Sequence, residues 1–300
     1  MNEANMGKKP FLTVITPTYN RNELLKNLYQ SLLNQTYQEF EWMIVDDGSI
    51  DDTESAIRKI LTEAPFKVSY YYKPNGGKHT ALNVGIKKIT TDLTIIVDSD
   101  DILLPDAIEK IKKSHVKYAR KDGIGAYCFL RVFANGKPIV SLDQDEFINS
   151  YVKYRIKENR PGDMAEVFKT KVLQEYPFPE FQGERFLSED VVWIQIGLKY
   201  NFAFINQPIY QCEYLEGGLT ANDKPMKFSS LLGSMMRGKM LMYKECGIKA
   251  NLKGAIIYNC YRYDVIGNIP NELKLKGIRN RLLITLTIPF GFFYNRKWKK

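Results

Sequence analysis

Residues 95–101, IIVDSDD, decide the fold, because an apolar run ends there abruptly in three carboxylates. β-Branched runs of this kind predict a buried strand, and open α/β sheets bind ligands at the carboxyl ends of their strands. Acidic side chains at that end have no role in packing. They suit a hard divalent cation, which takes oxygen ligands and in turn binds phosphate oxygens. The stretch therefore predicts a strand that leads into a cation and phosphate site.

The composition is that of a globular protein with one large or two small domains. Of its 300 residues, 44% are hydrophobic and 13% aromatic, which allows a sizeable core and excludes a disordered chain. Residues 1–10 lack the apolar stretch of a secretory signal, so export is not expected. The four cysteines have no CxxC spacing and are expected to be reduced thiols of a cytosolic protein.

The positive charge is concentrated in the last third of the chain. The formal net charge is +9, with +11 in residues 216–300 and −2 in the residues before them. This distribution predicts a surface-binding C-terminal region on a nearly neutral catalytic or binding body.

The first hundred residues alternate between predicted strands and predicted helices. Strands are predicted at residues 11–15, 41–45 and 68–72, and at the run before Asp98. The predicted helices are one capped by Asn20, those at 52–63 and 80–89, and one opened by Pro105. Short connections between alternating strands and helices predict a parallel, doubly wound sheet.

The remaining residues are less regular. We expect a strand at 125–133 with a turn at Asn135 and Gly136, an extended segment at 202–209, and a boundary near residues 216–218. Helices are predicted at 163–174, at 190–200 and in the basic region that follows the boundary.

Five blocks, in this order and spacing, carry a resemblance to a known family. They are VITPTYNR (14–21), VDDGSIDDT (45–53), NGGKHTALNVGI (75–86), VDSDDILLPD (97–106) and SEDVVW (188–193). Together they resemble the inverting family 2 glycosyltransferases of bacterial polysaccharide and cell-surface glycan synthesis, which have the GT-A fold.

The resemblance implies a fold class and a domain division. The α/β GT-A fold is a Rossmann-like, doubly wound mixed sheet, here followed by a mainly helical, basic C-terminal extension. We expect the GT-A domain at residues 10–215, with a nucleotide-binding half at 10–104 and an acceptor-binding half at 105–215. The helical basic region would then occupy residues 216–300.

The resemblance also implies a nucleotide-sugar site. Its expected residues are Pro17, Tyr19, Asn20, Arg21, Asp47, Gly77, Lys78, Asp98, Ser99 and Asp100. Asp47 would accept a hydrogen bond from the nucleotide base, with Tyr19 as a flat wall beside it and Pro17 setting the loop. Asp98 and Asp100 form the DxD motif: Asp100 would bind Mn²⁺ or Mg²⁺, and Asp98 would contact the ribose or a water on the metal. The donor expected from family habit is a UDP-sugar.

Several of these residues have ordinary structural interpretations as well. Asp46 and Asp51 are typical turn or cap residues, and Asp101 is expected to cap the helix that starts at Pro105. Gly77 would let the backbone approach a ligand while Lys78 binds phosphate, or the loop is a plain flexible turn with a solvated lysine. His79 has the same two interpretations.

Residues Ser188, Glu189 and Asp190 form the second decisive feature. Acidic residues at a helix start favour the helix dipole, so one interpretation is capping. The resemblance makes Asp190 the general base that deprotonates the acceptor hydroxyl and Glu189 a supporting acceptor-site carboxylate. Trp193 comes one residue earlier than in many relatives, so Glu189 remains a second candidate base. Residues 210–219 could line the acceptor cleft, although core packing explains Tyr210 equally well.

The end of the chain has the composition of a membrane-surface segment. Residues 282–294 are almost wholly apolar, too short to span a bilayer as a helix, and flanked by basic residues. Such a segment suits the headgroup region of an anionic membrane, and packing on the body or in a dimer is the alternative. Membrane contact through 279–300 would place the enzyme on the inner face of the cell membrane, beside a lipid-linked glycan acceptor.

Two other functional classes fit less of the sequence. One is a non-catalytic nucleotide-sugar-binding or membrane-tethering module, which has no need of an intact set of catalytic carboxylates. The other is nucleic-acid binding through the basic region, which is not expected because no nucleic-acid-binding module is recognisable and the apolar stretch fits lipid better than phosphate backbone.

Overall fold

The computed structural model describes residues 9–212 and 223–299. Its strands are β1 (Leu12–Thr18), β2 (Phe40–Asp46), β3 (Val68–Tyr72), β4 (Leu93–Ile96), β5 (Ile102–Leu103), β6 (Ile124–Phe133), β7 (Glu146–Ser150), β8 (Met164–Lys169) and β9 (Asn201–Cys212). Its longer helices are α1 (Asn22–Leu33), α2 (Thr53–Glu63), α3 (Lys78–Ile86), α4 (Ala107–Tyr118), α5 (Thr170–Gln174), α6 (Asp190–Gly197), α7 (Asp223–Phe228), α8 (Leu231–Leu241), α9 (Gly247–Arg262) and α10 (Ile278–Trp298). The π-helical turn η2 (Val152–Lys157) and the 3₁₀ turns η3 (Lys244–Cys246) and η4 (Asn271–Leu273) complete the described elements. The predicted boundary at 216–218 and the aromatic residues after 212 lie outside the described residues.

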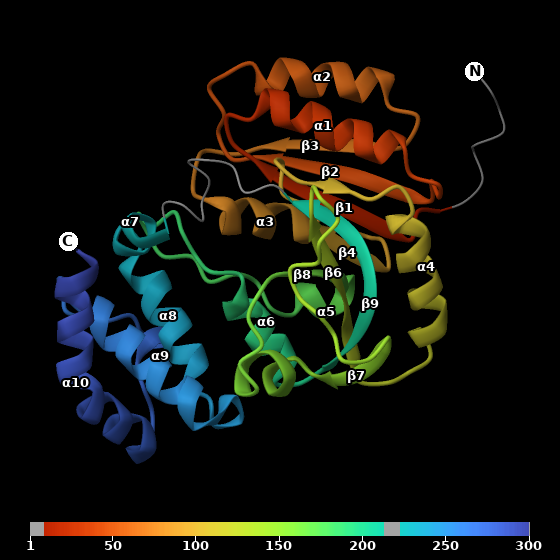
Figure 1. Cartoon of the computed structure of the whole chain (residues 1–300). Coiled ribbons are helices and arrows are strands. Elements are labelled where there is room, and N and C mark those ends of the chain that lie inside the picture. Colours follow the sequence, from red (N-terminus) through yellow and green to blue (C-terminus); the bar gives the residue numbers. More distant parts are fainter. Residues whose placement is uncertain (1–8, 213–222, 300) are drawn as a thin grey trace.

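All nine described strands belong to one mixed sheet, in the order β3-β2-β1-β4-β8-β6-β9-β5, and β7 pairs with the first half of β9 while β5 pairs with its end (Figure 1). The first four strands in this order are parallel, which confirms the doubly wound sheet predicted for the first hundred residues. The strand predicted at 125–133 and the turn at Asn135 and Gly136 are also confirmed.

The helix predicted at 163–174 is wrong over its first half. Residues 164–169 form β8, which runs antiparallel between β4 and β6 and pairs Val167 with both Ile95 and Tyr127. Only Thr170–Gln174 is helical. Pairing on both edges decides this segment, because a central strand satisfies all its backbone groups whatever its local propensity.

The helix starts predicted at Asn20 and at Pro105 are also wrong. Asn20 does not cap α1: it has φ +52°, and its side-chain oxygen accepts a hydrogen bond from Ile50 N–H in the neighbouring loop. Helix α4 begins at Ala107, two residues after Pro105. Asp101 is not its cap, because its carboxylate accepts a hydrogen bond from the hydroxyl of Tyr210 at 2.8 Å.

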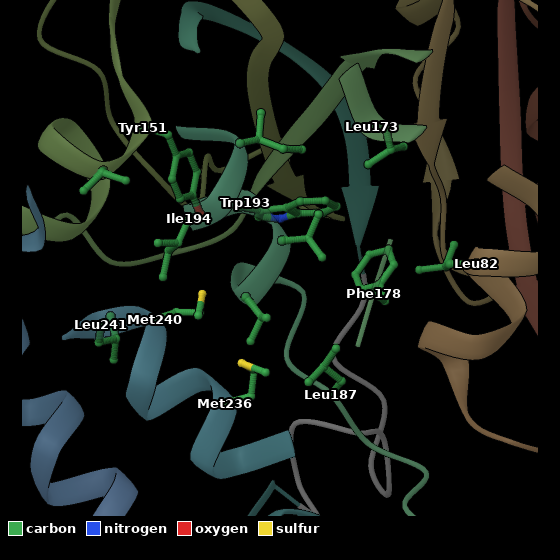
Figure 2. Close-up of a cluster of buried hydrophobic side chains, with 14 of the residues drawn as sticks. Leu82, Tyr151, Leu173, Phe178, Leu187, Trp193, Ile194, Met236, Met240 and Leu241 are labelled. Atoms are coloured by element: carbon green, nitrogen blue, oxygen red, sulfur yellow. The ribbon is translucent and has the colours of Figure 1, made fainter. Parts of the chain in front are cut away.

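Alternate residues of the strands pack on opposite faces of the sheet. Val14 of β1 packs in one buried cluster with side chains of α1, α2 and α4, and its neighbour Ile15 packs in a second cluster with α3 and α6. The second cluster continues without interruption into the C-terminal helices. Figure 2 shows Ile194 of α6 close to Met240 of α8. The basic region is therefore packed on the body of the molecule.

Helix α9 packs against both α8 and α10 (Figure 1). A Cβ added to Gly254 of α9 would lie 2.5 Å from the carbonyl oxygen of Gly238 in α8, so the two backbones meet where only glycine fits. Helix α10 contacts α9 through a narrow stripe that includes Leu283, Ile284 and Thr287. Its remaining surface exposes large apolar side chains: Ile278, Leu282, Leu286, Ile288, Phe290, Phe292 and Phe293. In the described parts of the chain, no helix is both long and apolar enough to cross a membrane.

Candidate active site

Three parallel strand ends meet at one edge of the sheet, as the sequence predicts. Thr18 of β1 pairs with Asp46 of β2, and Ile15 pairs with Ile96 of β4, so the loops that follow these strands lie together. They border a cavity of about 840 Å³ that extends from the sheet edge to the start of α6 and to α8. The cavity wall contains every predicted site residue except Asn20, whose backbone and side chain hold the loop at 49–50.

Asp47 is buried and organises the glycine loop. Its carboxylate accepts hydrogen bonds from the backbone N–H of Gly76 at 3.0 Å and of Gly77 at 2.7 Å, and pairs with Lys73 at 2.6 Å. Gly77 has φ +93°, and a Cβ there would lie 2.0 Å from the carbonyl oxygen of Arg185. The glycine is thus required by the chain itself. The ordinary turn interpretation of Asp46 is confirmed, because its carboxylate accepts the N–H of Ser49.

The two carboxylates of the DxD motif each pair with a basic side chain that was predicted for the donor site. Lys78 lies 2.5 Å from Asp98 and 3.0 Å from Glu189, and Arg21 pairs with Asp100. Burial works to raise the pKa of Asp98, but Lys78, Arg131 and Arg21 outweigh it and hold that pKa below its usual range. Burial works to lower the pKa of Lys78, but the charges of Asp98 and Glu189 outweigh it and raise that pKa. Both groups are therefore charged at neutral pH.

The chemistry of this group suits a hard cation. Carboxylate oxygens of Asp98, Asp100 and Asp101 lie within 4.8 Å of one another. Oxygen ligands in this number are what Mn²⁺ and Mg²⁺ take from proteins. Asp101 is held by Tyr210, which also accepts the N–H of Asp98 at 3.0 Å. Burial and the charge of Asp98 raise the pKa of Asp101 to about 7. Tyr210 is thus a fully buried residue that fixes the acidic turn.

Asp190 is the first residue of α6 and is fixed from another part of the chain. The Nε–H of Arg237 in α8 donates to both of its oxygens, at 3.0 and 2.8 Å. Neither Glu189 nor Asp190 makes a side-chain capping hydrogen bond to the helix start. The interpretation as a simple cap therefore has no hydrogen bond to support it. Arg237 was not predicted, because a single arginine in a basic region gives no sequence signal for its partner.

The cavity wall contains a second charged group that the sequence did not predict. Its members are Arg131 of β6, Arg155 of η2, Glu166 of β8 and Asp163. Arg131 donates to the carbonyl oxygen of Met164 and stacks on the ring of Tyr210. Burial raises the pKa of Glu166 to about 7, although Arg131 and Arg155 act to lower it. Glu166 was missed because its segment was predicted as a helix.

Comparison with known proteins gives the family. The model of glycosyl transferase family 2 matches residues 13–170, which is more than half of the chain and includes four of the five sequence blocks. The chain belongs to glycosyltransferase family 2. The match ends before Asp190, so it does not include the predicted base.

Named relatives of this family 2 glycosyltransferase are bacterial. An uncharacterized glycosyltransferase of Rickettsia bellii is 28% identical over 228 residues, which cover 73% of this chain and 31% of the relative. The GalNAc(5)-diNAcBac-PP-undecaprenol β-1,3-glucosyltransferase of Campylobacter jejuni is 29% identical over 204 residues, covering 64% of this chain and 62% of the relative. The chain spans about a third of the length of the Rickettsia bellii, felis and conorii relatives.

Solved structures establish the GT-A fold. TarS 1–349 of S. aureus in complex with UDP-GlcNAc superimposes with a TM-score of 0.62 at 16% identity, covering 97% of this chain and 92% of that chain. The mannosyltransferase PcManGT of Pyrobaculum calidifontis, in complex with GDP-Man and Mn²⁺, gives 0.57 at 17% identity, covering 98% and 88%. The fold class implied by the sequence blocks is therefore confirmed for this glycosyltransferase.

Proposed function

We propose that this family 2 glycosyltransferase moves a sugar from a nucleoside diphosphate, expected to be UDP, to a hydroxyl of a glycan acceptor with inversion at the anomeric carbon. The observation that carries the proposal is the single cavity that holds the DxD carboxylates at one side and Asp190 at another. A donor held by its diphosphate at Asp98 and Asp100 could present its sugar toward Asp190.

The donor would lie along the strand ends. Asp47 would receive the base beside Tyr19 and Pro17, and Ser99 would line the site near the DxD carboxylates. Asp98 and Asp100 would hold Mn²⁺ or Mg²⁺, which supplies Lewis-acid stabilisation of the charge that develops on the departing diphosphate. Occupation of these carboxylates by a cation would release Lys78 and Arg21 to pair with phosphate oxygens. TarS with UDP-GlcNAc and PcManGT with GDP-Man and Mn²⁺ support this arrangement through their shared fold.

The transfer is a single displacement. Asp190 accepts the proton of the acceptor hydroxyl while that oxygen bonds to the anomeric carbon from the face opposite the diphosphate. The bond between the carbon and the diphosphate oxygen breaks, and its electron pair leaves with the nucleoside diphosphate. Arg237 keeps both oxygens of Asp190 in a fixed direction, and Glu189 would contact the acceptor.

We propose a lipid-linked glycan as the acceptor and the inner face of the cell membrane as the location. The name of the Campylobacter jejuni relative describes transfer to an undecaprenol-linked glycan. The exposed apolar side chains of α10, next to Arg281, Arg296 and Lys297, suit the headgroup region of an anionic membrane. Their exposure favours membrane contact over packing on the body, which uses the opposite stripe of the helix.

Transfer to lipid extracts tests the proposal. Purified protein is incubated with labelled UDP-glucose, UDP-galactose, UDP-GlcNAc, UDP-GalNAc or GDP-mannose and with polyprenol-linked glycans from bacterial membranes, with Mn²⁺ or with EDTA. We expect label in the lipid fraction from one donor, only with the metal. Donor binding without transfer from any donor would favour the non-catalytic module instead.

A further inference from the structure

The cavity wall contains a buried arginine whose hydrogen bonds are incomplete. Arg155 is 8% exposed and donates one hydrogen bond, from Nη2 to the carbonyl oxygen of Gly162. Its Nε and Nη1 are buried and have no hydrogen-bond partner among the described residues. A guanidinium is always charged and offers only donors, and a buried donor without an acceptor is costly. Two guanidinium nitrogens of a residue in the cavity wall are therefore left to bind acceptor oxygens of a ligand.

Arg155 lies in an uncommon backbone element. Arg155 lies in η2, a π-helical turn, and such turns are rare and occur frequently at functional sites. No described carboxylate lies within ion-pair distance of Arg155, although Glu166 shares the same wall. The pairing of Val167 with Ile95 sets Glu166 beside the strand that leads to Asp98. Arg155 and Glu166 thus present hydrogen-bond donors and a hydrogen-bond acceptor to the same cavity.

The cavity that Arg155 and Glu166 line also contains the DxD carboxylates and Asp190. Lys78 pairs with Asp98 of the DxD motif at 2.5 Å and with Glu189, next to Asp190, at 3.0 Å, so the donor carboxylates and the base lie at one part of this cavity. In a displacement at the anomeric carbon, the group that lies between the leaving diphosphate and the base is the sugar being transferred. Its hydroxyls both donate and accept hydrogen bonds, which matches a guanidinium beside a carboxylate. A phosphate would instead face Glu166 and Asp163.

We propose that Arg155 and Glu166 form the subsite that selects the transferred sugar by its hydroxyl pattern. The inference rests on the proposed function, since it requires a nucleotide-sugar donor. Arg155 donates to sugar oxygens, and Glu166 accepts from a sugar hydroxyl. The subsite contributes to the affinity for the sugar and leaves the affinity for the nucleotide alone unchanged.

Calorimetric titration separates these two affinities. Wild type, Arg155→Gln and Glu166→Gln are titrated in Mn²⁺ with UDP, GDP, UDP-glucose, UDP-galactose, UDP-GlcNAc, UDP-GalNAc and GDP-mannose. Arg160→Gln is the matched control, because Arg160 lies five residues further, pairs with Asp143 and is absent from the cavity wall. We expect both site variants to bind the nucleotide within about twofold of wild type and the best sugar conjugate at least about tenfold more weakly.

The outcomes distinguish the inference from the function on which it rests. If wild type binds none of these ligands, the proposed function fails. The proposed subsite is wrong if wild type binds a nucleotide and every nucleotide-sugar with equal affinity. It is also wrong if both variants keep the wild-type difference in affinity between the nucleotide-sugar and the nucleotide. Thermal melting shows whether Arg155→Gln is folded. If it is not, Glu166→Gln decides alone, because glutamine has the same shape as the native residue. In that case we expect a changed ratio of the affinities for UDP-glucose and UDP-galactose.

Discussion

Asp190 is oriented by a residue 47 positions further along the chain. Arg237 donates to both carboxylate oxygens, so the direction of the carboxylate is set before an acceptor arrives. A general base has to lie within hydrogen-bond reach of the proton that it removes, and small misplacements reduce the rate strongly.

Replacing Asp190 by Asn should separate binding from transfer. The amide keeps the shape of the side chain but cannot accept the proton, so we expect transfer to fall by about 10²- to 10⁴-fold. Donor affinity measured by calorimetry should stay within about twofold of wild type. Glu189→Gln is the companion variant. If Asp190→Asn retains transfer and Glu189→Gln loses it, the base is Glu189.

Glu166 should make the stability of the protein depend on pH. Its pKa is raised from 4.5 to about 7, so the folded state holds the proton more tightly than the unfolded state. Its contribution is therefore unfavourable above pH 7, and this cost disappears as the pH falls toward 4.5. Arg131 and Arg155 face it with positive charge, and Asp163 and Glu189 with negative charge.

We expect Glu166→Gln to be more stable than wild type at pH 8, by on the order of 2 kcal/mol, and equal to it near pH 4.5. Urea unfolding at both pH values measures this difference. Glu54→Gln, on the exposed face of α2, is the control. A stability difference that is the same at both pH values would show that Glu166 titrates normally.

Among the elements, α10 has the clearest division of surfaces. Leu283 and Ile284 are buried against the rest of the molecule, and Leu286 and Phe293 are 67% and 57% exposed. Truncation before α10 would therefore damage the core, and substitutions on the exposed side are the better test of membrane contact.

The double variant Leu286→Gln/Phe293→Gln should weaken binding to anionic vesicles. Each side chain would bury apolar area worth about 1.5 kcal/mol or more, so we expect at least about a 100-fold loss in partitioning. Co-sedimentation with vesicles at low salt measures it. Val116→Gln on α4, where Val116 is 68% exposed, is the control. If wild type, the double variant and the control variant sediment equally with vesicles, or if wild type does not sediment with them, the membrane role is contradicted.

The elements that the sequence predicted correctly are those with strong local patterns. Apolar runs that end in acidic or glycine-rich turns located β1 to β4 and the cavity edge, because parallel strand ends must share one side of the sheet. β8 was missed because its sheet position depends on pairing with β4 and β6, which local periodicity does not report. Arg155 and Arg237 were missed for a similar reason: each acts on residues that only the tertiary structure brings near.

For the whole molecule, a donor bound with metal should raise thermal stability. At 100 times its Kd, a ligand that binds only the folded state contributes about 2.7 kcal/mol, which corresponds to a rise in Tm of about 4 °C for a chain of this size. We expect this shift from the correct nucleotide-sugar with Mn²⁺. Asp100→Ala should lose the part of the shift that depends on Mn²⁺; a variant with the wild-type metal response would remove Asp100 from the cation site.

The contact between Arg237 and Asp190 connects the basic helices to the cavity. A chimaera that exchanged residues 223–299 for a different membrane-binding module would lose the counter-charge of the proposed base together with the proposed lipid contact. Such a hybrid could still hold its nucleotide at the sheet edge yet turn over poorly. If the proposed function holds, membrane contact and the orientation of the base would thus be inherited together, through one guanidinium group.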